Sequence, residues 1–328
     1  MLGRTQKQTG RPSVSVCLIT GGAGNLACQL SRYLADRFQR FVLVDRAKAP
    51  VGSVSPSSIF VQGDLLDVDR MEDLFKKYRP SSVIHLASLL SGSCEQDRPL
   101  AWRVNMDGTF HLMETALRHG TGTVLFASSV ATFGDPVPEV LTDETPQWPE
   151  TLYGVTKMAA ERLGGYYSKR HGLDFRCLRL PTTISRNAPS GAVSALISRA
   201  FIEAVHSGGF IFTMRPDIRL AAIYIQDVLR AFGDLLAAPE SSLHRRVYNL
   251  NGFTTTPGEI AGVLRSRLPQ VSLEFQPDDA VDKVFSAWPG TIDDSAARRD
   301  WAWCPAWNLQ RTADDFLRLL QAEPKPQP

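Results

Sequence analysis

The sequence has little cysteine, almost no net charge and no long apolar run, and each shortage excludes a class of protein. Its 328 residues contain five cysteines without a Cys-x-x-Cys pair, so no disulfide-stapled secreted fold is indicated. The 36 basic and 34 acidic residues leave a formal charge of +2, which gives no electrostatic reason to expect nucleic acid or membrane as a partner. No segment reaches the roughly 18 uninterrupted apolar residues that a membrane span needs.

No signal peptide, disulfide or metal site is indicated by the chain ends, the cysteines or the histidines. The start, MLGRTQKQTGRPS, is polar and lacks the apolar centre of a signal peptide, so residues 1–13 are expected to be a disordered tail, as are residues 322–328. The cysteines are expected to be reduced thiols of a cytoplasmic protein, with Cys94 the most exposed. The six histidines show no paired spacing and predict no metal site. His85 follows an apolar run and is expected to be a hydrogen-bonded core residue.

What the sequence does contain begins with a strand, a glycine-rich turn and a helix in close succession. Residues 14–20 are apolar and partly β-branched, as in a buried strand, and the stretch after the turn is amphipathic. Gly21 and Gly24 remove the Cβ atoms that would keep a pyrophosphate from the backbone and the helix N-terminus. A second strand ends in Asp45, about 20 residues after the turn, where a carboxylate binds ribose hydroxyls and repels a 2′-phosphate. The pattern predicts a dinucleotide site that prefers NAD to NADP, although the guanidinium of Arg46 could accept that phosphate.

Farther along, Tyr153 and Lys157 stand four residues apart in a segment expected to be helical, so they share one face. An ammonium beside a phenol favours the phenolate and lowers the pKa of the tyrosine. Tyr153 is therefore a candidate general acid and base for an alcohol oxygen, which Ser129 could also hydrogen-bond. The spacing alone is common on solvated helices and gains its meaning from the dinucleotide pattern upstream.

Strands and helices alternate along most of the chain, as in a parallel doubly wound sheet. Further strands are expected near residues 59–61, 83–84, 124–127 and 175–180, and helices over residues 67–78, 101–119 and 152–169. The expected fold class is α/β, a Rossmann doubly wound parallel sheet with a smaller C-terminal substrate domain. The alternation of strands and helices changes to a loop after Leu180. We therefore assign residues 14–180 plus 222–251 to the cofactor domain, and residues 181–221 plus 252–321 to the substrate domain.

Together these pieces resemble the extended short-chain dehydrogenase/reductase family over almost the whole chain. The glycine turn, Asp45, Asp64-Leu65, His85-Leu86-Ala87, Asn105, Ser128-Ser129 and the Tyr153/Lys157 pair fall in that family's order and at its usual intervals. The resemblance implies that Tyr153 is the acid and base, that Lys157 also holds the nicotinamide ribose, and that Ser129 orients the substrate oxygen. It implies a cofactor site made of Gly21, Gly24, Asn25, Leu26, Asp45, Arg46, Asp64, Leu65, Leu86, Ala87, Asn105, Tyr153, Lys157 and Pro181.

A narrower resemblance, to the short-chain L-threonine dehydrogenases, rests on the segments LLSGSCE, GLDFRCLRLP, SAWP and DDSAARRDW. Those enzymes oxidise the β-hydroxyl of threonine with NAD. The chain departs from them after Pro189, where apolar residues mostly replace the polar groups that would hold the amino acid and Ser194 keeps a hydroxyl. L-Threonine itself is therefore in doubt as the substrate.

Sugar-acid dehydrogenases of the D-erythronate type are similar in that serine and in the pattern Pro216-Asp217-Ile218-Arg219. Arg219 would suit a substrate carboxylate, because a guanidinium offers a planar fork; alternatively it is a surface residue paired with Asp217 or Asp227. The implied substrate residues are Ser91, Ser128, Ser129, Thr182, Ser194 and Arg219.

The resemblance implies reversible hydride transfer between NAD and a secondary alcohol or ketone of a small hydroxy acid or 3-hydroxy amino acid. A nucleotide-sugar epimerase or dehydratase with tightly bound NAD is the alternative, although residues 213–224 lack the Arg-Asp-Phe element that such enzymes usually carry. A non-catalytic dinucleotide-binding protein would commonly lack the tyrosine or the lysine, and both are present. The expected partners are a small-molecule substrate and a second copy in a homodimer, with no nucleic acid, membrane or metal.

Overall fold

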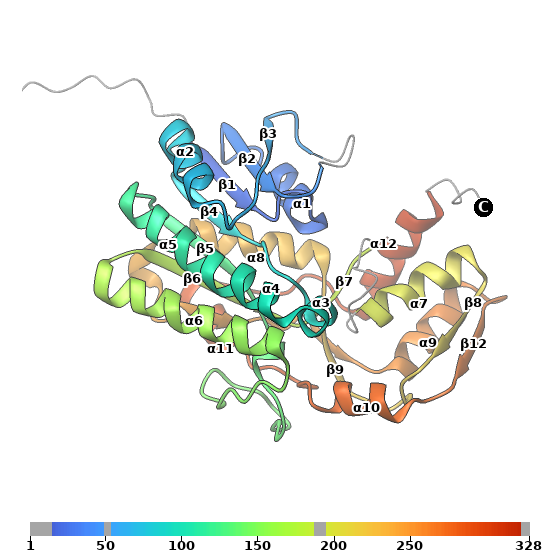
Figure 1. Cartoon of the computed structure of the whole chain (residues 1–328). Coiled ribbons are helices and arrows are strands. Elements are labelled where there is room, and N and C mark those ends of the chain that lie inside the picture. Colours follow the sequence, from blue (N-terminus) through green and yellow to red (C-terminus); the bar gives the residue numbers. More distant parts are fainter. Residues whose placement is uncertain (1–14, 49–53, 187–194, 323–328) are drawn as a thin grey trace, which may run out of the picture.

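A computed structural model of the chain describes residues 15–48, 54–186 and 195–322. Over these residues, seven parallel strands form the main sheet in the order β10-β6-β5-β4-β1-β2-β3 (Figure 1). The strands are β1 (Val16–Thr20), β2 (Arg40–Asp45), β3 (Ser58–Gln62), β4 (Ser82–His85), β5 (Thr123–Ser129), β6 (Asp174–Leu180) and β10 (Val247–Asn249). The chain starts near the centre of the sheet and winds outward in both directions, which confirms the predicted doubly wound Rossmann class.

Helices cover both faces of this sheet, as buried parallel strands require (Figure 1). On one face lie α1 (Asn25–Tyr33) and α8 (Ile225–Ala237), and on the other lie α2 (Val68–Tyr78), α5 (Gly108–Arg118) and α6 (Leu152–His171). The hydroxyl of Thr151 caps the start of α6 by accepting a hydrogen bond from the Gly154 amide at 3.1 Å. Gly172, with φ of 71°, ends the helix in the left-handed conformation.

The helix predicted over residues 101–119 is confirmed, and it contains a π-helical segment that the sequence did not predict. The chain passes from α3 (Ser91–Gln96) and α4 (Arg98–Trp102) through a π-helical turn, Arg103–Asp107, before α5 begins. Such a turn widens the helix by one residue and commonly marks a functional site. Here it carries Asn105, whose side chain is buried.

The C-terminal part of the chain adds two smaller sheets beside the main one (Figure 1). One contains β7 (Thr182–Ile184), β9 (Leu220–Tyr224) and β11 (Phe253–Thr255), and the other pairs β8 (Gly209–Phe212) with β12 (Ser272–Phe275). Around them lie α7 (Ala195–His206), α9 (Pro257–Arg267), α10 (Asp279–Ser286), α11 (Ser295–Trp301) and α12 (Leu309–Gln321). Short 3₁₀ turns cover Val130–Thr132 and Glu240–Ser242.

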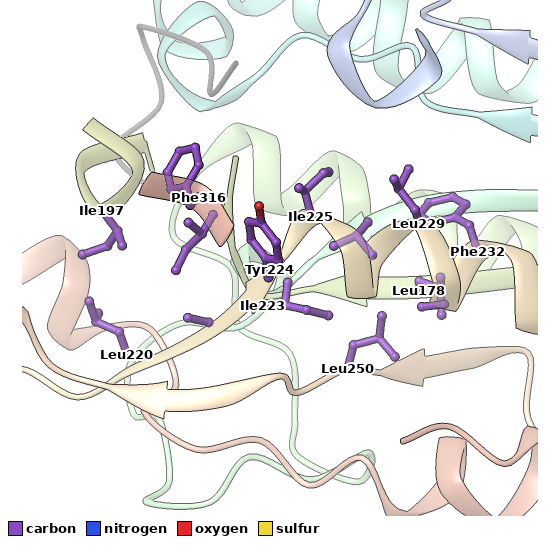
Figure 2. Close-up of a cluster of buried hydrophobic side chains, with 14 of the residues drawn as sticks. Leu178, Ile197, Leu220, Ile223, Tyr224, Ile225, Leu229, Phe232, Leu250 and Phe316 are labelled. Carbon is purple, nitrogen blue, oxygen red and sulfur yellow. The ribbon is translucent and has the colours of Figure 1, made fainter. Parts of the chain in front are cut away.

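One hydrophobic cluster runs from the main sheet into these smaller sheets (Figure 2). It joins Leu178 of β6 and Phe232 of α8 to Ile223 of β9, Ile197 of α7 and Phe316 of α12. The two parts of the chain are therefore packed through a shared core. The predicted domain boundaries stay a prediction, and the predicted tails lie almost entirely outside the described residues.

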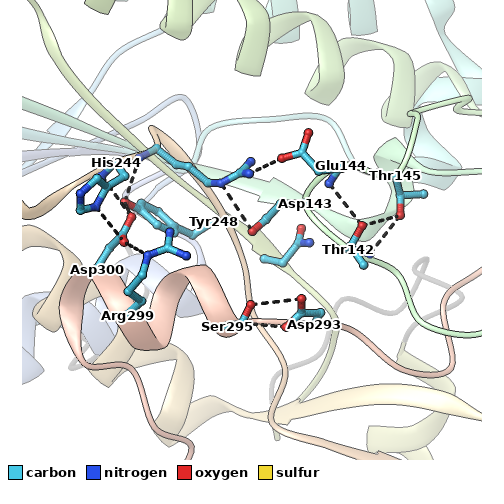
Figure 3. A network of polar contacts seen from close by, with 12 residues as sticks. Thr142, Asp143, Glu144, Thr145, His244, Tyr248, Asp293, Ser295, Arg299 and Asp300 are labelled. Carbon is cyan, nitrogen blue, oxygen red and sulfur yellow. Dashed lines mark hydrogen bonds and ion pairs between the residues drawn. The ribbon is translucent and has the colours of Figure 1, made fainter.

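A polar network fastens the C-terminal segment to the edge strand β10 (Figure 3). The buried carboxylate of Asp300 in α11 accepts hydrogen bonds from the Tyr248 hydroxyl at 2.8 Å and from the His244 amide at 3.0 Å. Arg245, from the same turn, bonds to Glu144 and so connects the strand to the loop before α6. None of the helices in the described ranges is long and apolar enough to cross a bilayer.

The two adjacent glycines of α6 provide a matched test of how tightly that helix packs on the sheet. A Cβ at Gly164 would lie 2.2 Å from the ring of the buried Phe175, whereas a Cβ at Gly165 would meet nothing within 4 Å. We expect Gly164→Ala to lower the free energy of unfolding by about 1–3 kcal/mol through overpacking. Gly165→Ala should raise it by about 0.5–1 kcal/mol, because alanine favours a helix. Urea denaturation measures both, and equal effects at the two positions would contradict this packing.

Candidate active site

A cavity of about 320 Å³ lies where the glycine turn and the carboxyl ends of the central strands meet the N-terminal half of α6. Ligands of doubly wound sheets bind at this edge. Of the residues predicted from the sequence, the cavity is lined by Gly21, Gly24, Asn25, Leu26, Leu86, Ser91, Ser128, Ser129, Tyr153, Lys157, Pro181 and Thr182. The structure thus brings together residues from segments that are far apart in the sequence.

The glycine turn approaches its neighbours too closely for side chains. Gly21 has φ of 70°, and a Cβ there would lie 2.9 Å from the Ala87 amide nitrogen. Gly22, which the sequence analysis did not single out, has the tighter fit, because its Cβ would lie 2.6 Å from the Val44 nitrogen. Gly24 precedes α1, and no described side chain caps that helix. The open N-terminus and bare backbone fit a pyrophosphate.

Asp45 ends β2 beside this turn, and its carboxylate is held by backbone donors. Its Oδ2 accepts a hydrogen bond from the Ala23 amide at 3.0 Å, and its Oδ1 accepts one from the Ala47 amide at 2.9 Å. The neighbouring Arg46 is exposed, so both candidates for reading a ribose lie at this strand end. Asp64 is exposed and accepts a hydrogen bond from the Leu66 amide, while Leu65 is buried.

Asn105 is buried and is not among the residues that line the cavity, so its place in the cofactor site stays a prediction. Its amide donates to the Leu89 carbonyl at 3.2 Å and to the Thr156 hydroxyl at 3.1 Å, and it accepts from the Leu89 amide at 2.8 Å. Asn105 therefore joins the loop after β4 to α6. Cys94 is buried beside Asn105, and its thiol lies 3.3 Å from the Leu89 carbonyl oxygen. The prediction that Cys94 is the most exposed cysteine is therefore wrong, because Cys304 is the exposed one.

His85 is a satisfied core residue, as the sequence indicated. One ring nitrogen lies 2.6 Å from the Thr20 hydroxyl and the other lies 2.9 Å from the Thr109 hydroxyl. Burial lowers the pKa of His85 to about 3, with a further contribution from the charge of Lys157, so the ring is neutral. His85 therefore stabilises the neighbouring strand ends through these hydrogen bonds, and it is not positioned to act as a general base.

Tyr153 and Lys157 project from the first turns of α6 toward the end of β5. The Ser129 hydroxyl lies close enough to the Tyr153 phenol to lower its pKa, and both side chains line the cavity. The ammonium of Lys157 donates to the Ala127 carbonyl at 2.8 Å and lies 5.5 Å from the centre of the Tyr153 ring. The three side chains thus share one wall of the cavity, as the spacing predicted.

The protonation of this pair differs from the prediction. Desolvation raises the pKa of Tyr153, Cys94 raises it further, and the Ser129 hydroxyl offsets only part of the rise. Burial lowers the pKa of Lys157 to about 8. The predicted lowering of the tyrosine pKa is therefore wrong for this structure, because Lys157 is directed at a backbone carbonyl and the phenol is desolvated.

Ser128 faces the cavity, but its hydroxyl is tied to a buried carboxylate that the sequence analysis missed. It donates to Glu161 Oε1 at 2.5 Å, and Gln147 donates to Glu161 Oε2 at 2.9 Å. The Arg179 guanidinium completes the set, with Nη2 2.8 Å from Oε2. The available signal was an acid four residues after Lys157, hence on the same helix face. Ser128 therefore lines the cavity, but its hydroxyl is already hydrogen-bonded to Glu161.

Other cavity residues were not predicted, because they come from elements whose position depends on tertiary packing. The apolar ones are Ala27, Leu90, Ala127, Val130, Ala131, Leu180, Ala195, Ile225, Val228 and Trp288, and the polar ones are Ser88, Thr183 and Ser185. Ser194 lies outside the described residues. Arg219 does not line this cavity; it donates to the Thr291 hydroxyl at 3.1 Å and is paired with neither Asp217 nor Asp227. The described ranges contain no cluster of His, Cys, Asp or Glu that could hold a metal ion.

The Glu161–Arg179 pair should dominate the stability of the site. Both side chains are buried, so Glu161→Gln leaves the guanidinium without its counter-charge, at a cost of about 3–5 kcal/mol in the free energy of unfolding. The exposed pair formed by Glu203 and Arg199 is the control, and Glu203→Gln should cost less than about 1 kcal/mol. Thermal and urea denaturation check both, and a loss in Glu161→Gln no larger than that of the control would contradict this assignment.

Known proteins of the same architecture bear out the expected family. The NAD dependent epimerase/dehydratase family matches residues 17–251 of the chain. Mitochondrial L-threonine 3-dehydrogenase of Bos taurus is 35% identical over 309 residues, which cover 93% of this chain and 83% of that protein.

Two solved structures extend the similarity to the whole fold. L-Threonine dehydrogenase from Phytophthora infestans superposes with a TM-score of 0.87 at 33% identity, covering 94% of this chain and 99% of that one. A monomeric L-threonine 3-dehydrogenase from a metagenome gives 0.86 at 27% identity, covering 93% and 98%. The chain therefore belongs to the NAD dependent epimerase/dehydratase family of extended short-chain dehydrogenase/reductase enzymes, and it is homologous to the L-threonine 3-dehydrogenases.

Proposed function

We propose that this protein oxidises the secondary alcohol of a small hydroxy acid or 3-hydroxy amino acid with NAD, and reduces the corresponding ketone. The observation that carries the proposal is that Tyr153, Ser129 and Lys157 line the wall of the same cavity as the glycine turn. An acid–base group is thus held next to the site that fits a dinucleotide.

The chain's own residues would hold the cofactor at two places. The bare backbone at Gly21 and Gly24 and the open end of α1 suit the pyrophosphate, and the carboxylate of Asp45 suits the ribose hydroxyls. When bound, NAD supplies the hydride acceptor and a positive charge on its nicotinamide ring. NAD is proposed over NADP because Asp45 would repel a 2′-phosphate.

Proton transfer falls to Tyr153. Desolvation keeps its phenol protonated in this structure, which is the form that donates a proton when a ketone is reduced. Oxidation needs the phenolate, whose charge the ammonium of Lys157, 5.5 Å from the ring centre, would partly offset, although desolvation has the larger effect in this structure. Ser129, which lines the cavity with Tyr153, would position the substrate oxygen on the same side.

The substrate pocket differs in character from a site built for a zwitterionic amino acid. The cavity wall includes Leu90, Val130 and Trp288, and Lys157 is the one cation among the described residues that line it. A nucleotide-sugar epimerase usually carries an Arg-Asp-Phe element, which residues 213–224 lack. The apolar wall supports a hydroxy acid with a larger or less polar body than threonine.

The compartment and assembly are also proposals. No disulfide joins any two cysteines of the described residues, which supports a reducing compartment such as the cytoplasm, although the bovine relative is mitochondrial. Large apolar side chains are exposed on the outer helices at Trp102, Phe110 and Tyr166. Their exposure supports a homodimer formed through α4, α5 and α6.

The experiment that tests the function is NADH formation at 340 nm with NAD and a panel of alcohols. The panel contains L-threonine, β-phenylserine, D-erythronate and simple 3-hydroxy acids, with a nucleotide sugar analysed separately for epimerised product. Net NADH with a hydroxy acid is the expected result. Conversion of the nucleotide sugar without net NADH would replace the proposal with the epimerase alternative.

Tyr153→Phe removes the proton-transfer group and keeps the ring. We expect kcat to fall by roughly 10²–10⁴-fold while NAD affinity stays nearly unchanged, because the phenol acts on the substrate oxygen. Tyr166→Phe, on the exposed side of the same helix, is the control and should keep full activity. Steady-state kinetics and NAD titration check this, and an active Tyr153→Phe enzyme would remove Tyr153 from the mechanism.

Asp45→Asn tests the cofactor preference. Loss of the charge should weaken NAD binding by roughly 10-fold and relieve the repulsion of a 2′-phosphate, so the NAD-to-NADP ratio of kcat/KM should fall. Asp36→Asn, on the exposed surface, should leave the ratio unchanged. If the ratio is unchanged in Asp45→Asn as well, another group such as Arg46 sets the preference.

A further inference from the structure

A second hollow of about 300 Å³ lies beside the catalytic cavity. Trp288 lines both, so the two share one wall. The other walls of the second hollow come from residues 137–139, 215–219 and 285–290. The two hollows therefore adjoin at the side chain of Trp288.

The walls of this outer hollow are fixed by contacts between segments that are distant in the sequence. Arg219 Nη2 donates to the Thr291 hydroxyl at 3.1 Å, and the Leu141 amide donates to the Thr291 carbonyl at 2.9 Å. Gly290 lets the segments meet, since a Cβ there would lie 2.8 Å from the Cβ of Arg219. These contacts between distant segments hold the residues around the hollow in place.

Its chemistry combines two cations with an apolar floor. Arg215 Nε lies 3.2 Å from Asp282 Oδ2, and the terminal nitrogens of that guanidinium make no hydrogen bond to any described residue. Arg219 Nη1 lies 3.9 Å from Glu139 Oε1, but the side chain of Glu139 is 86% exposed, so this pairing is weak. The floor is aromatic, with the rings of Phe285 and Trp288 5.1 Å apart. Guanidinium donors above apolar side chains suit an anionic head on a carbon chain.

From this arrangement, and resting on the proposed function, we infer that the substrate carries a carboxylate or phosphate at the far end of a carbon chain. The anionic head binds between Arg215 and Arg219, the chain lies along Trp288, and the alcohol reaches Tyr153. Lys157 is engaged with the Ala127 carbonyl, whereas Arg215 and Arg219 both line the adjoining hollow. An acid as short as threonine would leave both unused.

The test is a series in which the alcohol is constant and the anion moves away from it. The substrates are 3-hydroxybutyrate, 4-hydroxypentanoate and 5-hydroxyhexanoate, each with its methyl ester, and 3-hydroxybutyl phosphate. We expect kcat/KM to rise along the acid series and to exceed that of the matching ester by at least tenfold. Arg219→Gln should remove that advantage through KM, with kcat within about twofold and the esters unaffected, and Arg219→Lys should restore part of it.

The control is Arg199→Gln, an exposed arginine paired with Glu203, which should change no value in the series. A preference for the phosphate over the acids would identify the head group as a phosphate. Two results would overturn the inference. One is an equal loss of kcat/KM for acids and esters in Arg219→Gln, and the other is a preference for 3-hydroxybutyrate that does not depend on Arg219.

Binding separates this inference from the function on which it rests. Hexanoate has no alcohol to oxidise, so calorimetric titration measures the anion site without turnover. Binding that weakens about tenfold or more in Arg219→Gln supports the site even if no alcohol is oxidised. Binding that is equal in the two proteins contradicts it even if the enzyme is an active dehydrogenase.

Discussion

The buried carboxylate of Glu161 is the contact on which the shape of the active cavity depends. It lies on the same face of α6 as Tyr153 and Lys157, and it accepts hydrogen bonds from Ser128 at the end of β5 and from Arg179 at the end of β6. Two strand ends and the helix that carries the acid–base pair are therefore held by one side chain. Because each buried charge needs the other, the three elements cannot shift independently.

A second junction fixes the opposite wall. Asn105, placed by a π-helical turn, binds both the amide and the carbonyl of Leu89 and also the hydroxyl of Thr156. The loop that carries Leu90 and Ser91 into the cavity is thereby tied to α6. Thus α6 is connected on one side to the loop after β4 and on the other to the ends of β5 and β6. Preorganised groups of this kind stabilise a transition state without moving during the reaction.

The sequence was sufficient to predict the elements with a strong local signal. The glycine turn, Asp45, and the Tyr153/Lys157 spacing depend on backbone freedom, strand ends and helix periodicity, and the structure places the turn and the pair at one cavity and Asp45 beside the turn. Residues supplied by distant packing could not be found in this way. Trp288 and Val228 reach the cavity only because the C-terminal segments fold back over the main sheet.

The errors have the same origin. Cys94 follows polar neighbours and was expected to be exposed, but the contacts of Asn105 bury it. The pKa of Tyr153 was expected to fall because of Lys157, yet desolvation has the larger effect and the ammonium is directed elsewhere. Helix spacing shows that two side chains share a face, but it does not show how much water surrounds them or where a flexible amine is bonded.

The most direct test of the account follows the hydrogen that is transferred. A hydroxy acid oxidised by the enzyme is labelled with deuterium on the carbon that bears the hydroxyl, and the reduced cofactor is isolated and measured by mass spectrometry. Hydride transfer predicts that the deuterium appears in the released NADH. Deuterium that is returned to an epimerised product without release of NADH, or exchanged into water, would contradict the assignment of this protein as a dehydrogenase.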